Sequence, residues 1–172
     1  MQRPIFAFAL GLMVILGRPV TVSADDFVGT FDDWHVQTYE EGNAKVCLMW
    51  SQPTKGAGDY TARGDIYAYV THRPASKRLN EVSVSIGYPF KKESTLDITI
   101  GDQTFSLFTD GDTAWNRTPA DDGKMVEAMK AGITMVGRGV SARGTKTVDS
   151  YSLTGFTKAH ATMSKACGVG KK

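Results

Sequence analysis

The sequence predicts one mainly β domain of seven to eight mostly antiparallel strands, arranged as a sandwich or an open barrel, with two packed helices. Several segments alternate apolar and polar residues with a period of two, which is typical of half-buried strands. Short turn sequences separate these segments, so most neighbouring strands are expected to pair antiparallel. Two other stretches space their apolar residues as on one face of a helix. Together these patterns favour a sheet covered by two helices.

The first predicted strands form a hairpin. Trp34 and Val36 lead to the turn sequence EEGN at 40–43, and residues 46–50 return as a more apolar strand. The segment 53–65, PTKGAGDYTARGD, contains one proline and three glycines and predicts a loop. We therefore expect no regular structure between this hairpin and the next strand.

Period-two alternation is clearest in the middle of the chain. Tyr67 and Tyr69 share one strand face, opposite Ala68 and Val70, and residues 81–86 show the same pattern. Residues 95–100 and 104–108 predict a further hairpin around the turn pair at 101–102, and Asp-Gly-Asp at 110–112 predicts another turn. The middle of the chain therefore supplies at least four strands.

The first helix is predicted to begin at Pro119, because proline and acidic residues are favoured in a first helical turn, and to stop at Gly132. Residues 133–137 then predict a short buried strand. The segment 137–147, GRGVSARGTKT, predicts a connector rich in glycine and arginine, and residues 148–153 predict the last strand. Thr154 is expected to cap a final helix, whose apolar face is spaced as Phe156, Ala159, Met163 and Ala166.

Residues 1–24 match a secretory signal peptide. An apolar run at 5–16 follows Arg3, and small residues precede an expected cleavage site after Ala24. The run is shorter than the roughly 20 residues that a membrane-spanning helix needs. We therefore expect a mature domain of residues 25–172 with no transmembrane segment, located in the periplasm, at the outer membrane or outside the cell.

The charge and the cysteines narrow the classes of partner. Arg3 and Arg18 account for the whole formal net charge of +2, so the expected mature domain is neutral. A neutral domain argues against nucleic acid, because phosphate binding needs concentrated positive charge. Cys47 and Cys167 form an even pair in an exported chain, which predicts a disulfide bond rather than a metal site.

The sequence lacks a recognisable catalytic motif. The serine-rich stretch DSYSLTGF at 149–156 has no glycine two positions on either side of Ser152, so it is not a nucleophile elbow. His35, His72 and His160 show no metal-ligand spacing, and no phosphate-binding loop is present. We therefore expect neither an enzyme nor a cofactor or metal.

Two pairs of residues are candidates for a binding surface. Tyr67 and Tyr69 would form an aromatic platform if their strand face is exposed, although a second packed layer would bury them equally well. Arg138 and Arg143, each next to a glycine, would bind an anion, although an exposed flexible connector would account for the same sequence.

Four stretches of the sequence, in their order along the chain, resemble the invasion-associated locus B family of alphaproteobacteria. They are WHVQ at 34–37, KVCLM at 45–49, and two long segments at 113–139 and 143–159 that include D-x-Y-S-L-x-G-F before the last helix. The resemblance implies an exported protein of the bacterial envelope, related to a factor associated with entry into host red cells, and it brings no enzymatic activity. Longer family members carry further cysteines, so this chain resembles a short branch with one cysteine pair.

These observations predict an exported, disulfide-linked envelope protein that acts by binding to another envelope protein or to a host surface. Its role would lie in host-cell entry, as a virulence factor, or in envelope maintenance. The alternative is an envelope hydrolase, or a module that binds carbohydrate or a small ligand, with a site that is assembled only on folding.

Overall fold

The computed structural model describes residues 26–170. The predicted signal peptide, residues 1–24, lies outside the described residues. Within them, eleven strands form one antiparallel sheet in the order β1-β2-β3-β5-β6-β9-β8-β7-β10-β11-β4. The strands are β1 (Asp26–Phe31), β2 (Trp34–Glu41), β3 (Ala44–Ser51), β4 (Lys55–Gly58), β5 (Tyr67–Arg73), β6 (Arg78–Ser85), β7 (Thr95–Ile100), β8 (Gln103–Asp110), β9 (Thr113–Trp115), β10 (Thr134–Val140) and β11 (Lys146–Ser152).

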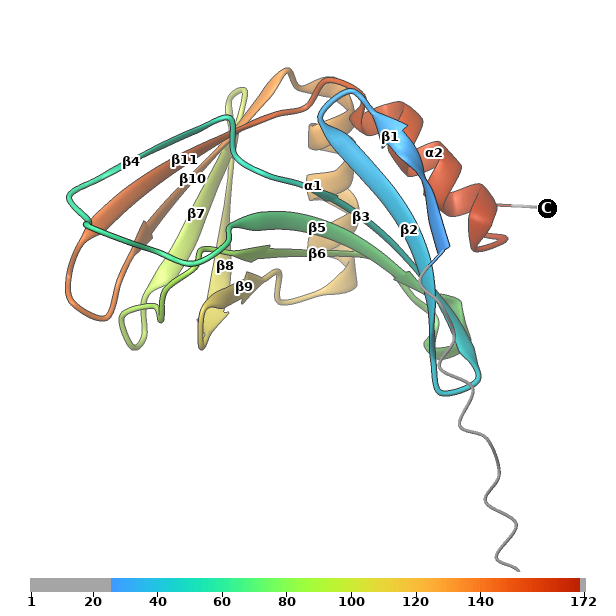
Figure 1. The fold of residues 1–172 in the computed structure, drawn as a ribbon, viewed down its shortest axis with the longest axis horizontal. Helices are drawn as coiled ribbons and strands as arrows, with labels where there is room; N and C mark the ends of the chain where they lie inside the picture. Colours follow the sequence, from blue (N-terminus) through green and yellow to red (C-terminus); the bar gives the residue numbers. More distant parts are fainter. Residues whose placement is uncertain (1–25, 171–172) are drawn as a thin grey trace, which may run out of the picture.

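The sheet curls strongly because β4, which follows β3 in the chain, lies at the opposite edge of the sheet. β3 ends at Ser51 and β4 begins at Lys55, yet β4 pairs with β11 at the far edge of the sheet. Three linking residues span little more than 10 Å, so the two limbs of the sheet must approach each other (Figure 1). The indole N–H of Trp34 in β2 also donates to the carbonyl of Ser152 in β11 across 3.1 Å. The result is one curled, open sheet, and the predicted alternative of a two-sheet sandwich is wrong.

The expected count of seven to eight strands is also wrong, because three short strands give little alternation. β4 lies within the segment 53–65 that was predicted as a loop, and its sequence KGAG carries no apolar pattern. β9 has three residues, and β1 is interrupted by a bulge between Phe27 and Gly29. Strands of this kind are specified by their hydrogen-bonding neighbours more than by their own residues.

The predicted connector at 137–147 is largely strand. β10 continues to Val140 and β11 begins at Lys146, which leaves a short turn between them. Gly139 faces the core, where an added Cβ would lie 3.1 Å from the ring of Phe90 and 3.2 Å from the side chain of Leu96. Glycine is needed here for space inside the curled sheet, and not for a turn.

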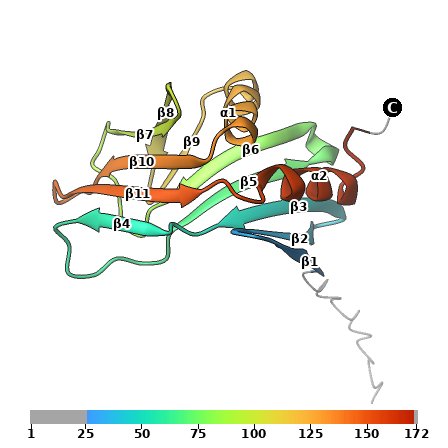
Figure 2. The ribbon, with the colours of Figure 1, turned by 90° about the horizontal axis from the view of Figure 1, so that it is seen from above.

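Both helices, α1 (Pro119–Ala131) and α2 (Phe156–Ala166), confirm the predicted positions and cover the apolar face of the sheet. The ring of Trp34 meets that of Phe156 edge-to-face, with centroids 4.9 Å apart. Figure 2 shows α2 alongside β3, and α1 beside β6. The predicted cap by Thr154 is wrong, because Gly155 with φ +84° precedes α2 and no side chain caps it.

The predicted disulfide is confirmed. Cys167, just after α2, is bonded to Cys47 in β3 across 120 residues of sequence. The bond holds the end of α2 against the buried side of the sheet, where Cys47 is fully covered. Since both cysteines are in the bond, the described part of the chain has no free thiol.

Candidate functional site

A row of aromatic side chains crosses the sheet on the face turned away from the helices. The strand register places His35 opposite Trp50, and Trp50 opposite Tyr69. The row continues through β6, β9 and β8 with the aligned residues Ser83, Trp115 and Phe108. We call His35, Trp50, Tyr67, Tyr69, Phe108 and Trp115 the aromatic face. Because opposite residues of paired strands point to the same side, this row is a direct product of the register.

The rings of the aromatic face pack against one another in two groups. In the first, His35 stacks on Trp50 with centroids 4.1 Å apart, and Trp50 meets Tyr67 edge-to-face at 5.5 Å. Tyr67 in turn lies 5.5 Å from Tyr69. Every ring of the face stays half-buried, so each keeps part of its surface in contact with solvent. Mutual packing holds these rings in position before any ligand arrives.

The second group lies on β8 and β9. Phe108 and Trp115 stack with centroids 5.8 Å apart, and the guanidinium of Arg117 lies 5.5 Å above the Phe108 ring. Ser83 stands between this group and Tyr69 in the register. The aromatic face therefore consists of two rigid ring clusters separated by a small hydroxyl side chain.

Three open hollows lie along the aromatic face. One of about 570 Å³ lies beside Tyr67 and Ser85, and one of about 420 Å³ lies between Tyr69, Gln37 and Arg73. A third, of about 460 Å³, lies against the Phe108 and Trp115 cluster. The first two hollows lie on opposite sides of the row, and the third lies at its β8 and β9 end.

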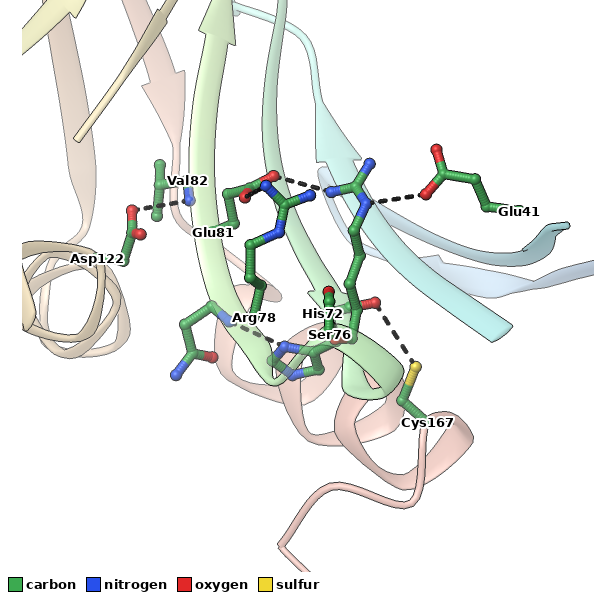
Figure 3. A network of polar contacts seen from close by, with 10 residues as sticks. Glu41, His72, Ser76, Arg78, Glu81, Val82, Asp122 and Cys167 are labelled. Atoms are coloured by element: carbon green, nitrogen blue, oxygen red, sulfur yellow. Dashed lines mark hydrogen bonds and ion pairs between the residues drawn. The ribbon is translucent and has the colours of Figure 1, made fainter. Parts of the chain in front are cut away.

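Beside Tyr69, charged groups border the face and form ion pairs with one another. Arg73 contacts Glu41 at 3.2 Å and Glu81 at 2.8 Å, and Arg78 contacts the second oxygen of Glu81 at 3.3 Å. Figure 3 shows Glu41, Arg78 and Glu81 in this network. Burial raises the pKa of the Tyr69 hydroxyl, which therefore stays protonated and available for hydrogen bonding at neutral pH. The border beside Tyr69 is thus polar, and its arginines are paired with carboxylates.

The structure separates the two predicted pairs. Tyr67 and Tyr69 belong to the aromatic face, which no described helix or second layer covers. Arg138 lies on β10, with four strands between it and β5, and donates to the Thr99 hydroxyl at 3.4 Å. Arg143 is exposed in the turn before β11. The arginines and tyrosines therefore do not form one site.

Sequence patterns did not identify His35, Trp50, Phe108 and Trp115 as site residues. Each lies on a different strand, and only the pairing register aligns them. Alternation indicates which residues of one strand share a face, as it did for Tyr67 and Tyr69. It carries no information about which residue stands opposite on a neighbouring strand.

A second polar cluster is buried beneath α2. The Nε2 atom of His72 lies 3.0 Å from the Ser164 hydroxyl, and the backbone N–H of Asn80 donates to Nδ1 of His72 at 3.0 Å. The Nε2 atom of His160 lies 2.8 Å from Oδ1 of Asn80. Burial is the main cause that lowers the pKa of His72 and that of His160 to about 4, and the charge of nearby Lys130 contributes to the same shift. Both imidazoles are therefore neutral near pH 7.

The tautomer of His72 decides what this cluster can do. Because Nδ1 accepts from Asn80, the proton of the neutral ring resides on Nε2, which donates to Ser164. A donor cannot remove the proton of that hydroxyl, so His72 is not positioned as a general base for Ser164. The serines of the stretch 149–156 lie elsewhere, and the Ser152 hydroxyl donates to the Thr154 hydroxyl at 3.0 Å. The described contacts of this cluster are those of helix packing.

A buried ion pair fixes the segment between β4 and β5. Two nitrogens of Arg63 each donate to an Asp149 oxygen at 2.8 Å, and both side chains are 5% exposed or less. The guanidinium also donates to the Ile86 carbonyl and lies 5.1 Å from the rings of Tyr60 and Tyr88. With four of its five N–H donors bonded to protein, Arg63 serves to anchor the loop to β11.

Comparisons with known proteins agree with this architecture. The family model described as "Invasion associated locus B (IalB) protein" matches residues 34–164. A crystal structure of invasion associated protein B from Bartonella henselae is similar over 80% of this chain and 95% of that one, with a TM-score of 0.57 and 14% sequence identity. No curated protein matches the chain. No helix in the described range 26–170 has the length and apolar character needed to cross a membrane.

Proposed function

Because the chain belongs to the invasion associated locus B (IalB) family, we propose that it is an exported envelope protein that acts by binding through its aromatic face. The signal-like leader, the disulfide and the neutral composition support export and a binding role. The mature protein would begin after Ala24 and reside in the periplasm, at the outer membrane or outside the cell.

The observation that carries this proposal is the aligned row His35, Trp50 and Tyr69, with its continuation on β8 and β9. Tryptophan and tyrosine dominate the energetics of protein binding sites because they bury a large area at little entropic cost. A half-buried aromatic surface on the uncovered face of a sheet is the type of exposed patch that marks an interaction site. The hollows beside it provide contact area for a partner.

The geometry of the buried histidines supports binding rather than catalysis. Of the two buried histidines, His72 faces a hydroxyl, that of Ser164, and the ring nitrogen facing the hydroxyl carries the proton. The Bartonella henselae neighbour is titled invasion associated, so a host surface is a second setting in which the same face would act.

Site-specific crosslinking in intact cells tests the proposal. A photo-crosslinking amino acid at Tyr67 or at Tyr69 should capture a defined envelope or host-surface component, whereas the same group at exposed Arg143 should not. Equal capture from Arg143, or no capture from either tyrosine in a folded and exported protein, contradicts a binding role for the face. Sequencing the amino terminus of the exported protein, with cell fractionation, tests cleavage after Ala24 and the location.

A further inference from the structure

We propose that the aromatic face binds a neutral glycan chain laid across the strands. This inference rests on the proposed binding function and names the class of its ligand. It follows from three properties of the face: the kind of side chains that compose it, their charge balance and their length as a row.

The composition of the row matches the two surfaces of a sugar ring. A pyranose presents C–H groups on its faces, which stack on the electron-rich faces of aromatic rings. Its hydroxyls point sideways and need hydrogen-bonding partners in the same plane. Trp50, Tyr69 and Trp115 supply rings along the row, and Ser83 supplies a hydroxyl between them. Gln37 and Arg73 line the adjoining hollow with planar polar groups.

The members of the row, from His35 to Phe108, are rings and one hydroxyl and include no aliphatic residue. Leu48 is an aliphatic neighbour that lines the hollow beside Tyr69. Aromatic residues also occur at protein interfaces, but the succession of rings and a hydroxyl in this row matches the faces and hydroxyls of sugar units.

The charges favour a neutral chain over an acidic one. Arg73, which lines the hollow beside Tyr69, already contacts both Glu41 and Glu81. A polyanion would have to displace these carboxylates. At the other side of the face it would meet the exposed Asp110 and Asp112 together with the cation of Arg117 above the Phe108 ring. Nucleic acid and acidic polysaccharides are therefore poor matches.

The length of the row indicates a chain rather than a single sugar. The row crosses six adjacent strands from β2 to β8. Since neighbouring strands lie about 4.8 Å apart, the row is roughly 24 Å long. The ring clusters stand at its two ends, so a ligand must reach across Ser83 to contact both. A linear oligosaccharide has this shape, and a monosaccharide would contact one cluster at a time.

Tryptophan fluorescence provides a direct test, because two of the three tryptophans belong to the face. Linear tetrasaccharides of N-acetylglucosamine and of glucose are titrated into the disulfide-bonded protein. We expect at least one to change the emission at saturation and to bind at least about tenfold more tightly than its monosaccharide. Trp50→Ala and Trp115→Ala should each weaken binding at least about tenfold, as measured by calorimetry. Trp50→Tyr and Trp115→Tyr, which keep a ring, should retain most of the affinity.

Matched variants make the result decisive. Trp34→Phe removes the buried tryptophan and should leave the affinity unchanged, and so should Arg143→Ala, which is remote from β5. Thermal unfolding checks that the Trp50 and Trp115 variants are folded. Binding that survives both alanine variants overturns the glycan proposal. If no tetrasaccharide binds while crosslinking from Tyr67 captures a protein, the glycan proposal is wrong and the binding function stands. If both experiments are negative, both proposals are wrong.

Discussion

The backbone N–H of Asn80 donates to Nδ1 of His72 across 3.0 Å, and this bond fixes the direction of the hydrogen bonds beneath α2. It leaves Nε2 of the buried imidazole as a donor to Ser164 on the helix. Asn80 adopts φ +60°, a left-handed conformation that asparagine tolerates better than most residues. A left-handed residue near the start of β6 thereby helps to set how the last helix is held against the sheet.

Stability should fall in mild acid because of His72 and His160. Burial lowers the pKa of each from 6.5 to about 4, so the unfolded chain binds more protons than the folded one between these values. The contribution of the two histidines to the free energy of unfolding should therefore be complete above pH 6.5 and decrease as pH falls toward 4. Fully buried His72 should account for up to about 3 kcal/mol, and the partly exposed His160 for less. Urea unfolding across this pH range measures the slope.

The variant His160→Gln isolates this effect. It removes one titrating ring and keeps a side chain able to contact Asn80, so the slope between pH 6.5 and 4 should become shallower. Glu127 and Lys130 also act on His160, the first raising its pKa and the second lowering it. A slope identical to that of the wild type would show that His160 does not contribute to the acid sensitivity.

Removing one partner of the Arg63–Asp149 pair should destabilise the fold strongly. Arg63→Met leaves an uncompensated carboxylate at a site that is 3% exposed, which typically costs about 3–5 kcal/mol. Adding Asp149→Leu to this variant should recover much of the loss, because an apolar pair replaces the stranded charge. Denaturant midpoints measure both. The exposed pair of Arg73 and Glu41 is the control, and Glu41→Gln should cost less than about 1 kcal/mol.

Loss of the disulfide should weaken the fold without changing its topology. The bond closes a loop between positions 120 residues apart, for which the chain-entropy model gives about 4–5 kcal/mol as an upper value. The Cys47→Ser, Cys167→Ser double variant should unfold at clearly lower denaturant. Reduction of the wild type should reproduce the shift, and an unchanged midpoint in both experiments would show that packing of α2 suffices.

Two glycines should respond to alanine in opposite directions. Gly123 lies inside α1 with nothing within 4 Å of an added Cβ, so Gly123→Ala should stabilise by about 0.5–1 kcal/mol. Gly155 has φ +84° and an added Cβ would collide with the carbonyl of Phe31. Gly155→Ala should therefore destabilise by more than about 2 kcal/mol. Thermal unfolding of the two variants gives the comparison, and a stabilised Gly155→Ala would contradict the close approach of β1 to α2.

Local patterns predicted the elements that carry their own periodicity. The alternation of apolar and polar residues correctly placed Tyr67 and Val70 on opposite faces of β5. Pro119 and Gly132 correctly marked the two ends of α1. Both signals act within one strand or one helix and need no knowledge of neighbouring elements. Sequence patterns did not predict β4 and the end of β10, because these segments carry no periodicity of their own. Their glycines normally indicate turns, and only the crowding of the curled interior around Gly139 shows why glycine is required there.

The candidate site was only partly predictable for a related reason. Tyr67 and Tyr69 emerged from the alternation of one strand. Their alignment with Trp50 and Trp115 depends on which strands are neighbours, and β9 was not predicted at all. The buried partners Arg63 and Asp149 are 86 residues apart, so nothing in either local sequence indicates the other.

The bond between Cys47 and Cys167 also sets an order of events during biosynthesis. Cys47 belongs to the first half of the chain to be made, and its partner follows 120 residues later. A thiol on β3 must therefore stay reduced and accessible until the ribosome has made nearly all of the domain. The bond therefore cannot close before Cys167 has been made, and an oxidant that acts earlier can only modify the Cys47 thiol or join it to a different molecule.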